Sequence, residues 1–248
     1  MAAKKTPKFD VPRVVSGLRA QFAELGTRER ARAEKAYLKS ELDFHGVTVP
    51  VVRSAAREFC RENPGLTRPH LRALVSALFE TRFHDLRSVG IAILECRADL
   101  LTTTDLPWLI ELARTAANWA HVDWLATKVL GRALPTGTAL GQLLTRWSRD
   151  PSLWVRRSAL LAQHDSLRAG AGDFALFARI ARPLVSEREF FIRKAIGWVL
   201  REVSKKRPNL SFEFLLAELG AVSGLTLREG AKYLSAAQRR KLGLAAPK

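Results

Sequence analysis

The stretch SEREFFIRKAIGWVLREVSKK, residues 186–206, decides the fold class of this chain. Its apolar residues recur at intervals of three and four, which places them on one face of an α-helix. These residues are Ile192, Ala195, Ile196, Val199 and Val203. Ser186 and Glu189 have the spacing of a capping box, so the pattern predicts a helix from Glu189 to Lys206.

The same helical period recurs along the rest of the chain, and no strand-like alternation runs for more than a few residues. A first helix is predicted from Val11 to Leu25, and Thr27 and Thr67 stand where N-caps of later helices are expected. The whole pattern predicts about twelve helices joined by short capped turns. We therefore expect an all-α fold, an α-solenoid of about six HEAT-like helical hairpins with a basic concave face. A compact orthogonal bundle is the alternative.

The 248 residues are expected to form a single HEAT-like repeat domain, 1–248, in which 1–8 and 236–248 are flexible tails. A hydrophobic content of 47% with 26% charged residues is typical of a folded globular protein. No apolar run approaches the roughly 18 residues of a membrane span. Lys4, Lys5 and Lys8 are not followed by the apolar core of a secretory signal. We expect no membrane contact and a cytoplasmic, nucleoid-associated location.

Net charge is the strongest global feature, because 41 basic residues face 24 acidic ones and leave a charge of +17. This charge is spread along the whole chain rather than held in a tail, which favours nucleic acid as partner over an unpartnered basic surface. Cys60 and Cys96 have no metal-ligand or CxxC spacing, so both are expected to be small buried residues. The five histidines show no ligand spacing either, and we expect no metal and no cofactor.

Three helical stretches carry residues that fit neither a core nor a surface pattern. Trp119 and Asp123 are four residues apart, so an indole and a carboxylate share one helix face. A carboxylate on a surface meant for phosphates needs a cationic partner or a catalytic role. Arg157 lies on the apolar side of its stretch, where a paired or snorkelling arginine is the structural alternative. Trp198 follows Gly197, a costly helix-interior residue unless another segment approaches closely.

Several of these stretches resemble motifs of the AlkD-type DNA alkylation-repair glycosylases, a family of HEAT-like repeat proteins. Residues 190–202, FFIRKAIGWVLRE, resemble its most characteristic stretch, and residues 153–159, LWVRRSA, resemble the signature before it. Trp119 and Asp123 match its Trp-x-x-x-Asp, while residues 37–50 and 225–229 resemble its N- and C-terminal motifs. The resemblance covers nearly the whole chain in the same order. One departure is that members often have Trp-Trp-Asp where this chain has Asn118, Trp119 and Ala120.

The resemblance implies that Asp123 is the catalytic carboxylate and that Trp119 and Trp198 are the indoles facing the base and the sugar. It also implies that Arg157 contacts the DNA backbone. The full set of expected DNA contacts lies in the matching stretches and consists of Arg157, Trp154, Lys194, Arg201 and Tyr37. Family members of this type leave the modified base near the stack, which implies excision without full base flipping.

The residue types suit such chemistry on their own. An N3- or N7-alkylated purine already carries a positive charge, so it leaves as a neutral base, and one carboxylate can stabilise the oxocarbenium-like sugar. No lysine is placed as a Schiff-base nucleophile, which predicts a monofunctional glycosylase. We thus expect a monomer that excises alkylpurines from double-stranded DNA in base excision repair. The alternatives are a non-catalytic DNA-binding paralogue, a glycosylase specialised for bulky adducts in resistance to a DNA-alkylating metabolite, and a protein-scaffold solenoid.

Overall fold

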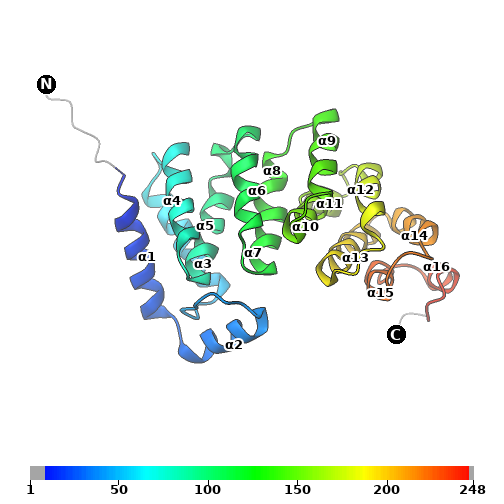
Figure 1. Cartoon of the computed structure of the whole chain (residues 1–248), viewed down its shortest axis with the longest axis horizontal. Coiled ribbons are helices and arrows are strands. Elements are labelled where there is room, and N and C mark those ends of the chain that lie inside the picture. The colour runs from blue at the N-terminus through cyan, green and yellow to red at the C-terminus, as the bar shows by residue number, and fades with distance from the viewer. Residues whose placement is uncertain (1–8, 246–248) are drawn as a thin grey trace, which may run out of the picture. The chain divides into compact units, whose positions relative to one another are not determined.

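A computed structural model describes residues 9–245, which form two compact units divided after Leu101 (Figure 1). Every regular element within that range is helical, and an isolated bridge between Asp43 and Phe83 is the one strand-like pairing there. The expected all-α class is confirmed. The single-domain organisation remains a prediction, and the tail expected at residues 1–8 lies outside the described part of the chain.

Unit 1 consists of five α-helices and a final 3-10 turn. They are α1 (Val11–Leu25), α2 (Arg28–Leu38), α3 (Val49–Glu62), α4 (Arg68–Glu80), α5 (His84–Cys96) and η1 (Ala98–Leu100). The side chains of Thr27 and Thr67 accept hydrogen bonds from backbone N–H groups of the following first turns, as expected of N-caps. Helix α5 packs against α3 and α4 and supplies much of the buried apolar surface of this unit.

Unit 2 contains the remaining helices. They are η2 (Thr103–Asp105), α6 (Leu106–Arg114), α7 (Trp119–Trp124), the π-helical η3 (Leu125–Leu130), α8 (Gly131–Ala133), α9 (Gly137–Ser148), α10 (Leu153–Leu161), α11 (His164–Ala169), α12 (Phe174–Ala181), η4 (Arg182–Leu184), α13 (Phe190–Ser204), α14 (Pro208–Ala217), α15 (Gly224–Gly230) and α16 (Ala236–Lys241).

Helix α10 is the centre of unit 2, because it packs against α6, α7, α9, α12 and α13. Figure 1 shows α9 and α12 on the same side of α10 and α13. The apolar side of α10 is fully buried at Val155, Ala159 and Leu160, and Ile196 and Val199 are fully buried on α13. Burial of such side chains contributes about 1.5–3 kcal/mol each and holds these helices in place.

Three details differ from the sequence-based expectations. The helix predicted over residues 189–206 is present as α13, but its N-cap Glu189 makes no side-chain cap bond, so the capping box with Ser186 was wrong. Residues 236–241, expected to be part of a flexible tail, form α16, since Ser235 and Gln238 make a capping box that starts a helix there. Cys96 is exposed and Cys60 is only partly buried, contrary to the expected burial of both.

Within residues 9–245, no helix combines the length and the apolar character that a membrane crossing requires.

Candidate active site

A buried ion pair joins α7 to α10 at the position where the family resemblance implies a catalytic acid. Arg157 Nε donates to Asp123 Oδ1 at 2.7 Å, and Arg157 Nη2 donates to Asp123 Oδ2 at 2.8 Å. The third nitrogen of the guanidinium, Nη1, donates to the backbone carbonyl of Phe191 on α13. The Arg157 side chain is 3% exposed and that of Asp123 is 16% exposed. One guanidinium therefore connects α7, α10 and α13.

Local sequence explains how Asp123 reaches this position. Asn118 caps α7, because its side-chain oxygen accepts hydrogen bonds from the N–H groups of Ala120 and His121 at 3.1 and 3.3 Å. Asp123 lies one turn further along. The helix then widens into the π-helical segment η3, and Thr127 Oγ1 donates to the Asp123 carbonyl at 2.8 Å. Short π-helical segments are frequent at functional sites.

Burial raises the pKa of Asp123, while the hydrogen bonds and the charge of Arg157, and the nearby His164, act in the opposite direction. A carboxylate held by both oxygens on a guanidinium keeps its negative charge at neutral pH. The site thus offers a charged carboxylate that is largely shielded from water. Electrostatic interactions made there are stronger than in bulk water.

The two expected indoles lie on the helices that this ion pair connects. Trp119 is the first residue of α7, one turn before Asp123, and is half-buried. Trp198 is half-buried on α13 and contacts the ring of His164, with ring centroids 4.6 Å apart and an interplanar angle of 52°. Each indole therefore keeps part of its surface accessible beside a rigid helical support.

His164 belongs to a polar chain that no sequence motif indicates. His164 is buried, its Nδ1 lies 3.0 Å from Asp165 Oδ1, and Asp165 Oδ2 accepts from Lys128 Nζ at 2.6 Å. Lys128 lies on η3, directly after the helix that carries Asp123. Burial lowers the pKa of His164, and the hydrogen bond to Asp165 raises it; the net shift is downward, which leaves a neutral imidazole at neutral pH.

The neutral ring of His164 presents its Nε2 to the protein interior. That atom is buried and has no hydrogen-bond partner among residues 9–245. The contact with Trp198 places His164 beside one of the expected catalytic groups. A histidine followed by an aspartate is a weak signal in sequence, and only the packing of α11 against α13 and η3 identifies it.

Trp154 lies on the first turn of α10, and its ring is 5.2 Å from that of Phe191. Phe191 also contacts Phe190, which is 57% exposed, and Arg157 lies over its ring at 5.7 Å. An aromatic cluster of Trp154, Phe190 and Phe191 therefore borders the ion pair.

The remaining expected DNA contacts lie elsewhere. Lys194 and Arg201 on α13 both bind Glu229 of α15, at 3.0 and 2.6 Å. Gly197 lies between them, and a Cβ atom there would come within 2.7 Å of the Glu229 Cβ, so α15 approaches α13 closely at this glycine. Tyr37 belongs to unit 1, where it is 72% exposed on α2.

The structure thus groups Asp123, Arg157, Trp119, Trp198 and Trp154 on three adjoining helices. Their assigned roles remain predictions. Within residues 9–245, no group of three or more His, Cys, Asp or Glu side chains is arranged to hold a metal ion.

Comparison with known proteins places the chain in a class of DNA-repair enzymes. It belongs to the family described as DNA alkylation repair enzyme, whose family model matches residues 18–234. Comparison with curated proteins gave no match.

Solved structures share the fold. A predicted DNA alkylation repair enzyme from Enterococcus faecalis is 24% identical with a TM-score of 0.74, covering 85% of this chain and 97% of that one. AlkD2 from Streptococcus mutans is 13% identical with a TM-score of 0.59, covering 92% and 100%. The protein smu.31 from Streptococcus mutans UA159 is also 13% identical, with a TM-score of 0.57 and coverage of 90% and 99%. At these identities the likeness shows the fold alone.

Proposed function

We propose that this member of the DNA alkylation repair family is a monofunctional DNA glycosylase, which hydrolyses the N-glycosidic bond of cationic N3- and N7-alkylated purines in duplex DNA. The observation that carries the proposal is the shielded carboxylate of Asp123, held by Arg157 between helices that also carry Trp119 and Trp198. Membership of the family supplies the substrate context, damaged DNA.

The proposed reaction needs no acid for the leaving group. When the bond between C1′ and the alkylated nitrogen breaks, its electron pair neutralises the positive charge of the purine, which departs as a neutral base. Positive charge develops on the deoxyribose, and the Asp123 carboxylate stabilises it electrostatically. A water molecule adds to C1′ and loses its proton by way of Asp123. The faces of Trp119 and Trp198 attract the cationic sugar or base by about 0.5–2 kcal/mol each.

Arg157 has a different proposed role from Asp123. Three of its five N–H groups already serve Asp123 and the Phe191 carbonyl, which makes it a positioning residue that fixes the carboxylate. The two N–H groups that remain are suited to a phosphate oxygen. A phosphate contact at a side chain that is 3% exposed requires close approach of the DNA backbone.

The test is release of 7-methylguanine and 3-methyladenine from duplex DNA in the presence of EDTA. We expect release by the wild type and its loss in Asp123→Asn. Because this substitution also breaks a buried ion pair, Asp123→Asn with Arg157→Met serves as the variant without an unpaired buried charge. Glu187→Gln is the matched control, since Glu187 pairs with Arg156, the residue adjacent to Arg157, at 3.0 and 3.2 Å. Normal release by the folded double variant would refute the catalytic role of Asp123.

A further inference from the structure

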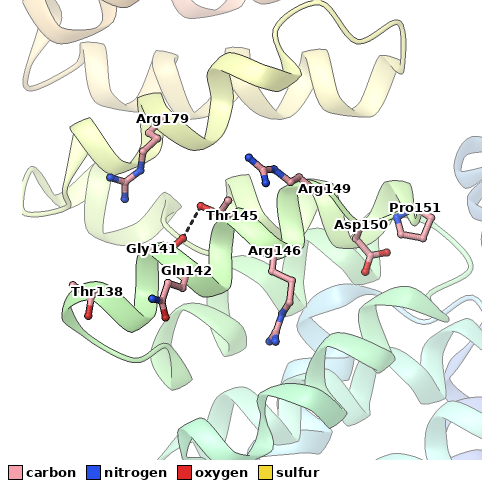
Figure 2. A pocket seen from close by; sticks show the side chains of 9 residues that line it. All are labelled: Thr138, Gly141, Gln142, Thr145, Arg146, Arg149, Asp150, Pro151 and Arg179. Atoms are coloured by element: carbon pink, nitrogen blue, oxygen red, sulfur yellow. Dashed lines mark hydrogen bonds between the residues drawn. The ribbon is translucent and has the colours of Figure 1, made fainter.

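An open groove of about 900 Å³ lies beside α9 and α12, and its lining contains no residue assigned to the candidate active site. Its basic lining residues are Arg146, Arg149 and Arg179. Figure 2 shows Arg149 and Arg179 in the space between the two helices, whereas Arg146 leaves α9 in another direction. Groove residues come from α9, α12 and the turn before α10, and none belongs to the set around Asp123.

The three groove guanidiniums are distinguished by their lack of counter-ions. Within residues 9–245, neither an ion pair nor a hydrogen bond engages the guanidinium of Arg146, Arg149 or Arg179. Neighbouring arginines behave differently: Arg156 binds Glu187, and Arg182 at the end of α12 binds Glu218. An unneutralised concentration of positive charge therefore lines this groove.

The single carboxylate of the lining does not compensate that charge. Asp150 is held on both oxygens by Arg114 of α6, at 2.6 and 2.8 Å. These hydrogen bonds lower the pKa of Asp150, so it is charged at neutral pH and is engaged by Arg114, which also binds Glu111 at 3.0 Å. The other polar lining residues, such as Gln142 and Thr145, are neutral.

A glycine on α9 allows one guanidinium to lie against the helix. A Cβ atom at Gly141 would come within 2.8 Å of Arg179 Nη2, so a side chain there would displace the guanidinium. Thr145 Oγ1 donates to the Gly141 carbonyl at 2.7 Å (Figure 2). The position of Arg179 thus depends on the absence of a side chain at Gly141.

We propose that the groove between α9 and α12, which holds Arg149 and Arg179 and has Arg146 at its side, is a second phosphate-binding site, which takes the phosphodiester backbone of a DNA segment other than the one at Asp123. Guanidinium groups bind phosphate oxygens through directed N–H bonds, and such contacts are independent of base sequence. No aromatic side chain lines the groove, so it offers no stacking surface for a free nucleotide base. The proposal rests on DNA as the family's substrate and not on base release.

The test is the salt dependence of binding to a long undamaged duplex, measured by fluorescence anisotropy. In Arg149→Gln with Arg179→Gln, the slope of log affinity against log salt should fall by about 2, close to 0.9 for each phosphate that is no longer neutralised. Gly141→Ala should lower it by about 1, because the arginines remain and only Arg179 moves. Arg240→Gln with Lys241→Gln, two exposed residues of α16, is the charge-matched control and should leave the slope unchanged.

Equal slopes for the groove and control variants would overturn the proposal. A second result would also overturn it: pyrophosphate raises the Tm of the wild type in a thermal-shift measurement, and the groove substitutions leave duplex binding unchanged. The ligand of the groove would then be a free phosphate and not DNA. Base release from a short damaged duplex at saturating enzyme should be normal in the groove variants. The measurement of the groove uses undamaged DNA. If the wild type released no base, the glycosylase proposal would be refuted, but the proposed phosphate-binding site would not be affected.

Discussion

The ion pair between Asp123 and Arg157 should matter as much for stability as for chemistry. Both side chains are largely buried, so removing one partner leaves an uncompensated charge inside the protein. Breaking a buried pair in this way costs about 3–5 kcal/mol. For a protein of this size, each kcal/mol lowers Tm by roughly 2–4 °C, so Asp123→Asn and Arg157→Met should each lower Tm by about 6–20 °C.

The double variant Asp123→Asn with Arg157→Met separates the contribution of the ion pair to stability from the cost of leaving one charge unpaired. Removing both charges leaves no unpaired buried charge, although the Phe191 carbonyl loses its donor. The penalty of an uncompensated charge, the largest cost in each single variant, is therefore absent. We therefore expect the unfolding free energy of Asp123→Asn with Arg157→Met to lie above that of either single variant. Urea unfolding followed by circular dichroism measures this non-additivity directly.

Glu187→Gln is the control for the urea unfolding measurement, because it breaks a more exposed ion pair. Glu187 is 24% exposed and its partner Arg156 is 16% exposed, so this pair lies nearer to solvent than that of Asp123 and Arg157. Loss of the pair between Glu187 and Arg156 should lower the free energy of unfolding by about 1 kcal/mol or less. The reasoning would be refuted if both single variants at the buried pair unfolded within about 1 kcal/mol of the wild type.

Three further predictions follow from the packing of unit 2. Gly197→Ala should destabilise the protein by about 1–3 kcal/mol, because the new methyl group meets the Glu229 Cβ; unchanged urea unfolding would show that α15 moves away freely. His164→Phe should keep the fold but lower the rate of base release at saturating DNA more than the affinity, since the support of the Trp198 indole changes; an equal effect on both, or none, would contradict this. The pKa of Asp150 is lowered by its bidentate arginine partner, so the stability it contributes at neutral pH is lost as pH falls below about 4. Asp150→Asn should therefore unfold with a weaker pH dependence than the wild type in that range, measured by thermal melts.

Much of the fold was predictable because its signals are local. A helix needs an apolar stripe at the helical period, a polar residue to cap its first turn, and a residue that ends it, and all of these lie within a few positions of one another. Val11–Leu25 was predicted with its observed bounds, and Thr27 and Thr67 cap helices as expected. The π-helical segment η3 could not be predicted in this way, because no distinctive residue pattern marks the point where the helix widens.

For the candidate site as well, local sequence indicated single residues, whereas their contacts depended on the tertiary structure. The roles of Trp119 and Trp198 came from the family resemblance. Sequence alone singled out Arg157 as a charge on the apolar side of its helix and Asp123 as a carboxylate on a surface meant for phosphates. It did not determine that Arg157 takes both oxygens of Asp123, a partner 34 positions away, nor that Lys194 and Arg201 converge on Glu229. The strength of an ion pair depends on distance and burial, and packing sets both of these quantities for residues far apart in the chain.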